Sequence, residues 1–241
     1  MSQPTVSIQR LHYGYITAPE GSDDTGQPLP VCGYVVETPK GRVLFDTGLS
    51  PVDDGLRERY APRGSTVADV LERAGLATGD IDMIVNCHMH VDHAGGNSAF
   101  PDVPIYVQAP ELRAAEGPNH TFPQYSFDFP GAKLRVIDGE TEVVPGVRIV
   151  PTPGHTPGHQ SLVVDTPAGP VLLAGQAFNT ASAFGFAAFS HRLDRDGLDT
   201  IGTHPAWMER IDEIGPVRGL FAHDLTVFEP DDASIGSPQP L

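Results

Sequence analysis

Three histidines and an aspartate lie within six residues, in a His-x-His-x-Asp-His pattern at residues 88–93. The pattern follows a largely apolar run that predicts a short buried strand, and two glycines behind it predict a turn. In an extended chain, residues i and i+2 face the same side, so His88 and His90 can reach one ion while Asp92 and His93 turn toward a second position. Imidazole and carboxylate suit zinc, manganese or iron. The pattern therefore predicts a metal site at a strand end.

This spacing resembles the signature of the metallo-β-lactamase superfamily. The resemblance covers most of the chain, because further pieces of the pattern occur in order from Asp46 to Asp224. It implies an αββα sandwich, in which two mixed β-sheets are flanked by helices and a metal cleft lies at one edge where loops meet. We therefore predict a single domain over residues 1–241, with a loosely ordered tail at residues 229–241.

The resemblance also implies the ligands of two metal ions. The first ion is expected at His88, His90 and His155, and the second at Asp92, His93 and His223. His155 lies in a loop in which proline and glycine restrict and shape the backbone. Two residues are expected to support the ligands from behind, where such partners fix the imidazole tautomer: Asp46 and His159. His120 has an irregular spacing to the other histidines, so we interpret it as a rim or surface residue.

The chain departs from the family pattern at Gln176. Family members normally have an aspartate here that bridges two metal ions, whereas glutamine is neutral and binds metals weakly through its amide oxygen. Asp92 would then be the only one of the two usual carboxylates left to compensate the positive charge of two ions. We therefore expect weaker binding of the second ion and regard Gln176 as a weak metal or substrate contact. Asn179 stands where the lactonase branch of the family has a tyrosine that helps to hold the substrate carbonyl.

Within the superfamily, the chain most resembles the lactonases that open acyl-homoserine lactones. The resemblance rests on the chain length, the Asp-Thr-Gly strand end at residues 46–48, the spacing to His155 and a final His-Asp pair. It implies a metallohydrolase in which zinc lowers the pKa of bound water to about 7. The resulting hydroxide attacks the carbonyl of a lactone or related ester of a small apolar metabolite, and Asp92 orients the water. One or two divalent ions are expected, with zinc first and manganese or iron as alternatives.

Residues 178–191 contain several phenylalanines among small side chains. The segment is interpreted either as a buried structural element or as an apolar lid over the metal centre. The second interpretation makes four residues candidates for the substrate pocket: Phe178, Asn179, Phe184 and Phe186.

Gln176 leaves two other functional classes open. A lyase, cyclase or oxygenase acting on a secondary metabolite would need only one metal ion, although the oxygenase version is weakened because its usual aspartate ligand is the residue replaced by Gln176. A non-catalytic binding protein is disfavoured, because nothing structural requires all the other ligands to be kept.

The composition restricts the classes of binding partner and the cellular compartments that we expect. A net charge of -16 without a basic cluster argues against nucleic acid. The sequence has neither a basic and apolar leader nor an apolar run of about 18 residues, which argues against secretion and membrane insertion. Cys32 and Cys87 are interpreted as reduced thiols of a cytoplasmic protein. The expected partner is a small-molecule substrate, and a homodimer is compatible with the sequence.

Overall fold

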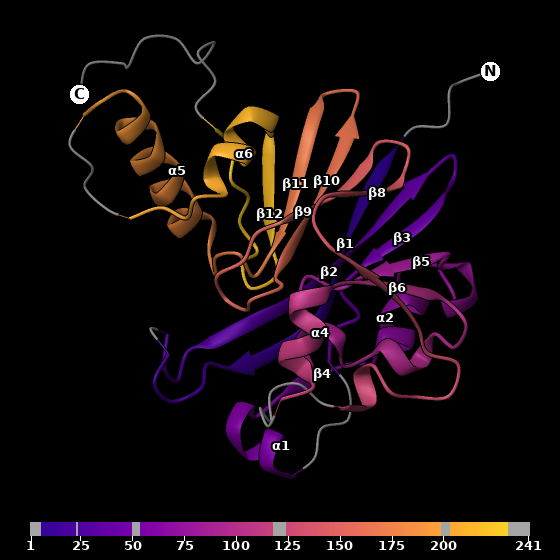
Figure 1. The fold of residues 1–241 in the computed structure, drawn as a ribbon. Helices are drawn as coiled ribbons and strands as arrows, with labels where there is room; N and C mark the ends of the chain where they lie inside the picture. Colours follow the sequence, from indigo (N-terminus) through magenta and orange to yellow (C-terminus); the bar gives the residue numbers. More distant parts are fainter. Residues whose placement is uncertain (1–5, 23, 50–53, 118–123, 199–202, 231–241) are drawn as a thin grey trace.

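The computed structural model describes residues 6–22, 24–49, 54–117, 124–198 and 203–230 (Figure 1). His120 and almost all of the predicted tail at residues 229–241 lie outside these described residues. Among the described residues, no helix combines the length and the apolar character that crossing a bilayer requires.

The first sheet has the strand order β4-β1-β2-β3-β5-β6-β7. Strands β1, β2 and β3 pair antiparallel, whereas β3, β5, β6 and β7 pair parallel, so the sheet is mixed. The strands are β1 (Ser7–Thr17), β2 (Pro28–Thr38), β3 (Gly41–Phe45), β4 (Arg63–Gly64), β5 (Met83–Val85), β6 (Pro104–Gln108) and β7 (Lys133–Ile137).

The second sheet has the strand order β12-β11-β10-β9-β8. It is also mixed, because β12 runs parallel to β11 while the other neighbours are antiparallel. Its strands are β8 (Thr141–Val144), β9 (Val147–Pro151), β10 (Gln160–Thr166), β11 (Gly169–Gly175) and β12 (Arg218–Phe221).

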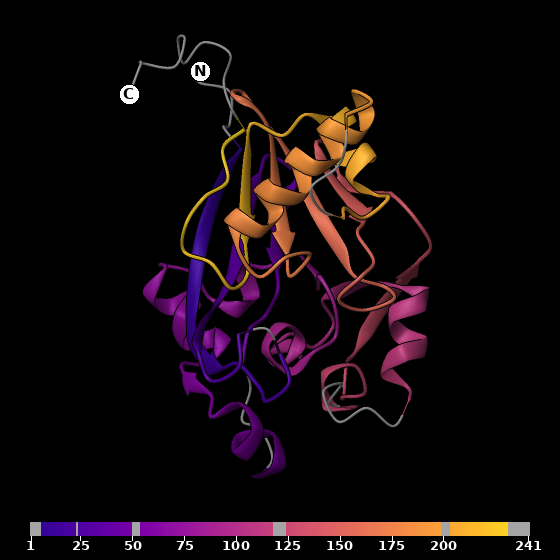
Figure 2. The same ribbon diagram turned by 90° about the vertical axis from the view of Figure 1, so that its left-hand side faces the viewer.

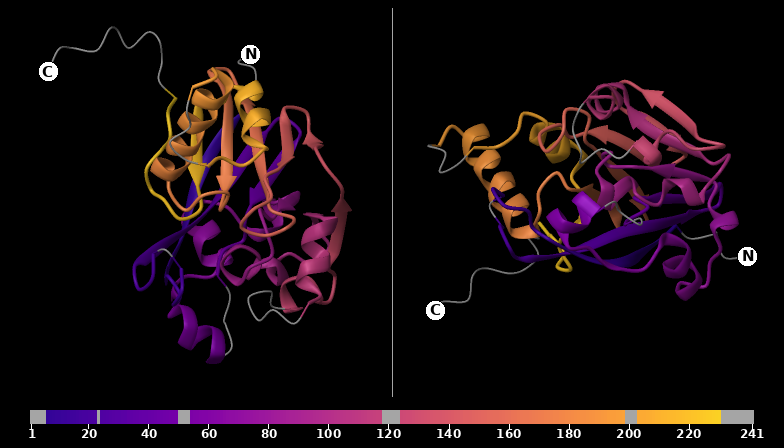
Figure 3. Two further views of the ribbon diagram at one scale, coloured as in Figure 1. Left: turned by 60° about the vertical axis from the view of Figure 1, so that its left-hand side comes forward. Right: turned by 90° about the horizontal axis from the view of Figure 1, so that it is seen from below.

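Helices cover the outer faces of both sheets. On the first sheet, α2 begins with a capping box between Thr66 and Asp69 and buries Val70 and Leu71 against the strands. On the second sheet, α5 and α6 pack their apolar faces on the strands (Figures 2 and 3). The helices are α1 (Asp54–Tyr60), α2 (Val67–Arg73), α3 (Val91–Ala94), α4 (Ala109–Ala115), α5 (Ala181–Arg195) and α6 (Met208–Ile214).

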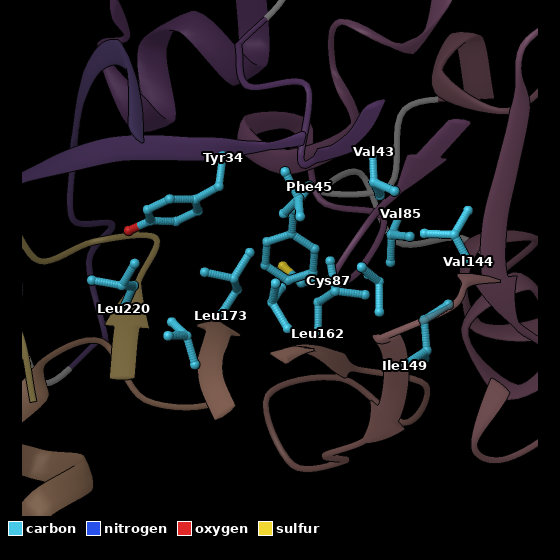
Figure 4. Close-up of a cluster of buried hydrophobic side chains, with 14 of the residues drawn as sticks. Tyr34, Val43, Phe45, Val85, Cys87, Val144, Ile149, Leu162, Leu173 and Leu220 are labelled. Carbon is cyan, nitrogen blue, oxygen red and sulfur yellow. The ribbon is translucent and has the colours of Figure 1, made fainter. Parts of the chain in front are cut away.

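The inner faces of the two sheets share one hydrophobic cluster. Phe45 and Val85 from the first sheet meet Leu162 and Leu173 from the second, and all four side chains are fully buried (Figure 4). The hydroxyl of Tyr34 in β2 donates a 2.7 Å hydrogen bond to the carbonyl of Phe221 in β12, which satisfies a polar group inside this cluster. The arrangement confirms the predicted αββα sandwich of two mixed sheets.

The structure shows where the last helix begins and which element the phenylalanine-containing segment enters. Residues 204–214 carry Trp207, Met208 and Ile211, a pattern that predicts a helix from His204 onward, but α6 begins only at Met208. The reason is local, because His204 precedes Pro205 and the residue before a proline is disfavoured in helical conformation. Residues 181–191 of the phenylalanine-containing segment lie in α5, which belongs to the outer helical layer.

Candidate metal centre

The candidate site is formed where several strands of both sheets end. His88 and His90 follow β5, and His155 lies in the loop between β9 and β10. Gln176 follows β11, and His223 follows β12. The sandwich thus brings residues that are far apart in the sequence to one edge of the molecule.

His88, His90 and His155, together called the imidazole group, offer ring nitrogens that lie within 4.8 Å of one another. The Nε2 atom of His155 lies 3.1 Å from Nδ1 of His90. The Nε2 atom of His88 is buried and has no hydrogen-bond partner among the described residues. A buried unpaired nitrogen is costly, so its position fits a metal ligand.

The protonation of the imidazole group also suits a metal. Burial, reinforced by the neighbouring histidines, lowers the pKa of His88 well below its usual value. Burial and His155 lower the pKa of His90 to about 3, and burial and His93 lower the pKa of His155 to about 4. All three rings are therefore neutral at pH 7, which is the form that binds metal ions.

Asp92, His93 and His223 form a second set, called the mixed group. The Nε2 atoms of the two histidines lie 3.2 Å apart, and each lies 3.5 Å from Oδ2 of Asp92. Nδ1 of His93 lies 2.9 Å from a carboxylate oxygen of Asp46, and Nδ1 of His223 lies 2.7 Å from the carbonyl oxygen of Pro30. Because both acceptors require a proton on Nδ1, the Nε2 lone pairs are left to face one another, as a shared cation would require.

Asp46 organises the mixed group from behind. Its Oδ1 accepts a 2.7 Å hydrogen bond from the backbone N–H of Cys87, while its Oδ2 lies against His93. The residue has a φ of 64°, in the left-handed region, which aspartate tolerates better than most side chains. Although burial favours the neutral ring, the carboxylates of Asp92 and Asp46 raise the pKa of His93.

His159 fixes the backbone beside the site. Its Nδ1 donates to the carbonyl oxygen of Thr152 at 3.1 Å, and its Nε2 accepts a 3.1 Å hydrogen bond from the backbone N–H of Gln176. Since both ring nitrogens are used, His159 supports the chain rather than offering a ligand atom. Gly175 has a φ of 58°, and a Cβ atom there would lie 2.5 Å from that of Cys87, so only glycine fits before Gln176.

Gln176 lies beside the mixed group and contacts one of its residues. Its Oε1 lies 3.1 Å from Nε2 of His93. The glutamine that replaces the usual aspartate of the family pattern therefore presents an oxygen beside the Nε2 atom of His93.

Glu111 is a supporting residue that the sequence analysis missed. The side chain, from the first turn of α4, is fully buried. Its two carboxylate oxygens accept hydrogen bonds from the backbone N–H groups of Met89, at 2.9 Å, and Gly158, at 3.1 Å. It thus joins the two loops that carry the imidazole group. An acidic residue at a helix N-terminus is common, so nothing in the sequence indicated this inward role.

A cleft of about 740 Å³ opens over both groups. Tyr60 from α1 lines it together with the site residues His90, Asp92, Gln176 and Asn179. Apolar side chains form part of the remaining wall, notably Ile16, Leu29 and Pro157. The cleft is thus polar at the ligand groups and partly apolar away from them.

The structure places the three phenylalanines of the predicted substrate pocket away from the lining of the cleft. Phe178, Phe184 and Phe186 are not among the described residues that line the cleft. Phe184 is 1% exposed in the core under α5, Phe178 packs edge-on against it, and Phe186 is 50% exposed. Residues i and i+2 lie on nearly opposite faces of a helix, so Phe184 and Phe186 cannot face one pocket. Of the four predicted pocket residues, Asn179 does line the cleft.

The chain is similar in sequence to a known protein family. Residues 26–215 match the Metallo-beta-lactamase superfamily. The chain belongs to this superfamily. An N-acyl homoserine lactonase of Bacillus sp is 39% identical over 182 residues, which cover 68% of this chain and 72% of the relative. A probable metallo-hydrolase of Mycobacterium bovis is 33% identical over 205 residues, which cover 73% and 63% of the two chains.

Solved structures of the superfamily share the same fold. An N-acyl homoserine lactone hydrolase, with the product N-hexanoyl-L-homoserine bound at its catalytic metal center, has a TM-score of 0.70 and 28% identity. The similarity covers 92% of this chain and 94% of that chain. The predicted family, fold and enzyme class are confirmed, and the chain is a metallohydrolase whose superfamily membership implies a divalent metal.

Proposed function

We propose that this protein hydrolyses the ring ester of N-acyl homoserine lactones or closely related lactones. The observation that carries the proposal is the pair of ligand groups at the base of a partly apolar cleft, in a chain 39% identical to an N-acyl homoserine lactonase. The polar base suits a lactone carbonyl, and the apolar wall suits an acyl chain.

The two ligand groups fit divalent ions. His88, His90 and His155 would hold one ion, and Asp92, His93 and His223 would hold the other. We favour zinc, because nitrogen ligands with a single carboxylate are typical of zinc sites. Bound zinc ions lower the pKa of water to about 7 and act as Lewis acids toward a carbonyl oxygen.

Asp92 is the candidate catalytic side chain. Burial alone would favour its neutral form, but His93 and His223 lower its pKa, so the carboxylate is charged and faces the cleft. It would accept a hydrogen bond from the attacking water and so orient it. As the water oxygen bonds to the carbonyl carbon, the ring C–O bond breaks, and the leaving alkoxide takes up the released proton.

Tyr60 is the candidate donor for the substrate. Burial raises its pKa, so the phenol stays protonated at neutral pH, and it lines the cleft with Asp92. A protonated phenol can donate a hydrogen bond to a carbonyl oxygen of the acyl homoserine lactone. Tyr60 would thus orient the substrate from α1, a helix that the sequence analysis did not predict.

Turnover of N-hexanoyl homoserine lactone by the zinc-loaded protein tests the proposal. We expect one equivalent of acid per lactone opened, measured by pH-stat titration, and the open-chain acid as the product by mass spectrometry. Protein treated with a chelator should lose this activity and regain it with zinc. Zinc-replete protein that opens neither short-chain nor long-chain N-acyl lactones would refute the assigned substrate.

A mononuclear lyase, cyclase or oxygenase remains the second candidate because of one observation, the neutral Gln176 side chain at the mixed group. Metal analysis and the lactone titration together separate the two candidates. The second candidate predicts one ion per chain by metal analysis and no acid release from lactones.

Cellular setting and assembly are also proposed. We favour a cytoplasmic protein because Cys32 and Cys87 are buried and unpaired. We favour one domain for the whole chain because a single hydrophobic cluster joins both sheets. The homodimer and the exclusion of nucleic acid and membrane remain predictions from the sequence.

A further inference from the structure

Three polar side chains form a hydrogen-bonded series that ends at the mixed group. Asn179 Nδ2 donates to Asp24 Oδ2 at 2.8 Å. Gln176 Nε2 donates to Asn179 Oδ1 at 3.1 Å, and Gln176 Oε1 lies 3.1 Å from Nε2 of His93. The series connects the loop between β1 and β2 to the end of β11, across 155 positions of the sequence.

Asp24 sets the direction of the hydrogen bonds in this series. A carboxylate can only accept hydrogen bonds, whereas the two ends of an amide differ, one accepting and the other donating. Asp24 therefore selects the NH2 end of Asn179, which turns the oxygen of Asn179 toward Gln176. That oxygen in turn selects the NH2 end of Gln176, so the amide oxygen of Gln176 must point to His93. Asp24 thereby decides which atom of a distant glutamine faces the site.

We propose that Asp24 is a positioning residue that, through Asn179, holds the amide oxygen of Gln176 as a neutral ligand for an ion at the mixed group. The inference rests on the metal centre of the proposed function but not on its lactone substrate. Two hydrogen bonds, from Asn179 to Asp24 and from Gln176 to Asn179, are sufficient to set the orientation of the Gln176 amide.

The series also changes the strength of the ligand. An amide oxygen binds metals more weakly than a carboxylate. Hydrogen bonds in series polarise one another, and the negative charge of Asp24 draws the amide protons outward and increases the negative charge on the Gln176 oxygen. Part of the effect of the missing aspartate is thus supplied from behind, without a second negative charge in the cleft itself.

The test measures zinc binding to the full chain by calorimetry, with the two ions titrated in turn. Asp24→Ala should weaken the second ion about tenfold and leave the first unchanged, because loss of a group that orients a ligand typically costs 10- to 100-fold in affinity. Asp24→Asn should fall between Asp24→Ala and the parent, because an amide oxygen can still accept from Asn179. The matched control is Glu20→Ala, which removes the same charge from an exposed residue of the same loop and should change neither affinity.

A double variant makes the result specific. In a Gln176→Leu background, Asp24→Ala should have no further effect on the second ion, because the group through which it acts is gone. Equal second-ion affinity in the parent and Asp24→Ala, equal losses in Asp24→Ala and Glu20→Ala, or a single ion in the parent would each overturn the proposal. Binding is measured without a lactone, so failure of lactone turnover leaves this test intact.

Discussion

The imidazole group and the mixed group lie side by side but are built differently. The imidazole group uses neutral rings, and its chain segments are tied together by the single carboxylate of Glu111. The mixed group contains a charged ligand, Asp92, and its rings are turned by two acceptors from other strands, Asp46 and Pro30. The segments of the first pocket are thus joined by one side chain, whereas the rings of the second are oriented by acceptors from two separate parts of the first sheet.

This difference predicts which substitutions should impair each pocket. Changes in the loops after β5 and β9 should damage the imidazole group directly. The mixed group should respond to changes in residues that never touch an ion, because its ring orientations are imposed by Pro30 of β2 and by Asp46, which follows β3. Three experiments test the properties of the two groups and of the cleft above them.

The largest effect is expected from His88→Ala. The variant removes the buried Nε2 atom of the imidazole group, and we expect kcat/KM to fall by about three orders of magnitude, since metal catalysis supplies several kcal/mol. His223→Ala should instead lose the second ion and keep the first, as measured by elemental analysis. His12→Ala, at an exposed position of β1, is the matched control. A His88→Ala protein that is metal-free and fully active would remove the metalloenzyme proposal.

A smaller effect is expected from Tyr60→Phe. Loss of the phenol donor beside Asp92 should lower kcat/KM about fivefold, because one hydrogen bond to a neutral group contributes about 1 kcal/mol. Zinc affinity should stay the same, since Tyr60 belongs to neither ligand group. Tyr15→Phe, which alters a 40% exposed tyrosine, should leave both quantities unchanged. Weaker zinc binding in Tyr60→Phe would show that the residue supports the pocket instead of the substrate.

The smallest effect concerns the pH dependence of the metal-free protein. Burial and His155 hold the pKa of His90 at about 3 in the folded state, against 6.5 as its ordinary value. The unfolded chain therefore binds more protons below pH 6.5, and the stability present above that pH is lost as the pH falls toward 3. We expect the free energy of unfolding to drop by up to about 1.4 kcal/mol per pH unit from this residue.

Urea unfolding at about pH 7.5 and about pH 5.5 measures this drop. His90→Gln, which cannot be protonated, should flatten the curve relative to the parent. A parent and variant with the same pH dependence would show that His90 is not held neutral by the fold.

Much of the sandwich was predictable because its elements carry local signals. The β10–β11 hairpin follows from two apolar runs around a Pro-Ala-Gly turn, and α2 follows from its capping box. The helix α5 was not distinguished from a lid, because its small residues and phenylalanines give no clear amphipathic pattern, and only the packing decides which phenylalanine is buried.

The candidate site likewise contains residues that the sequence indicates and residues that only the fold reveals. The His-x-His-x-Asp-His pattern indicated its position, since the residues are neighbours in the chain. Glu111, Tyr60 and Asp24 gave no signal, because each is an ordinary residue for a helix end or a polar loop until the fold places it beside the cleft. The sequence predicts ligands that share a motif better than supporters that come from elsewhere.

The meeting of His93 and His223 has a consequence for how the molecule holds together. These two residues are 130 positions apart: His93 lies in α3, which follows β5 of the first sheet, and His223 follows β12 of the second. An ion shared between them would act as a reversible cross-link, closing a loop that spans more than half of the chain. A covalent link across a loop of this length restricts the unfolded chain enough to stabilise a fold by roughly 4 to 5 kcal/mol. Loading the site would therefore join elements that belong to the two sheets and raise the free energy of unfolding.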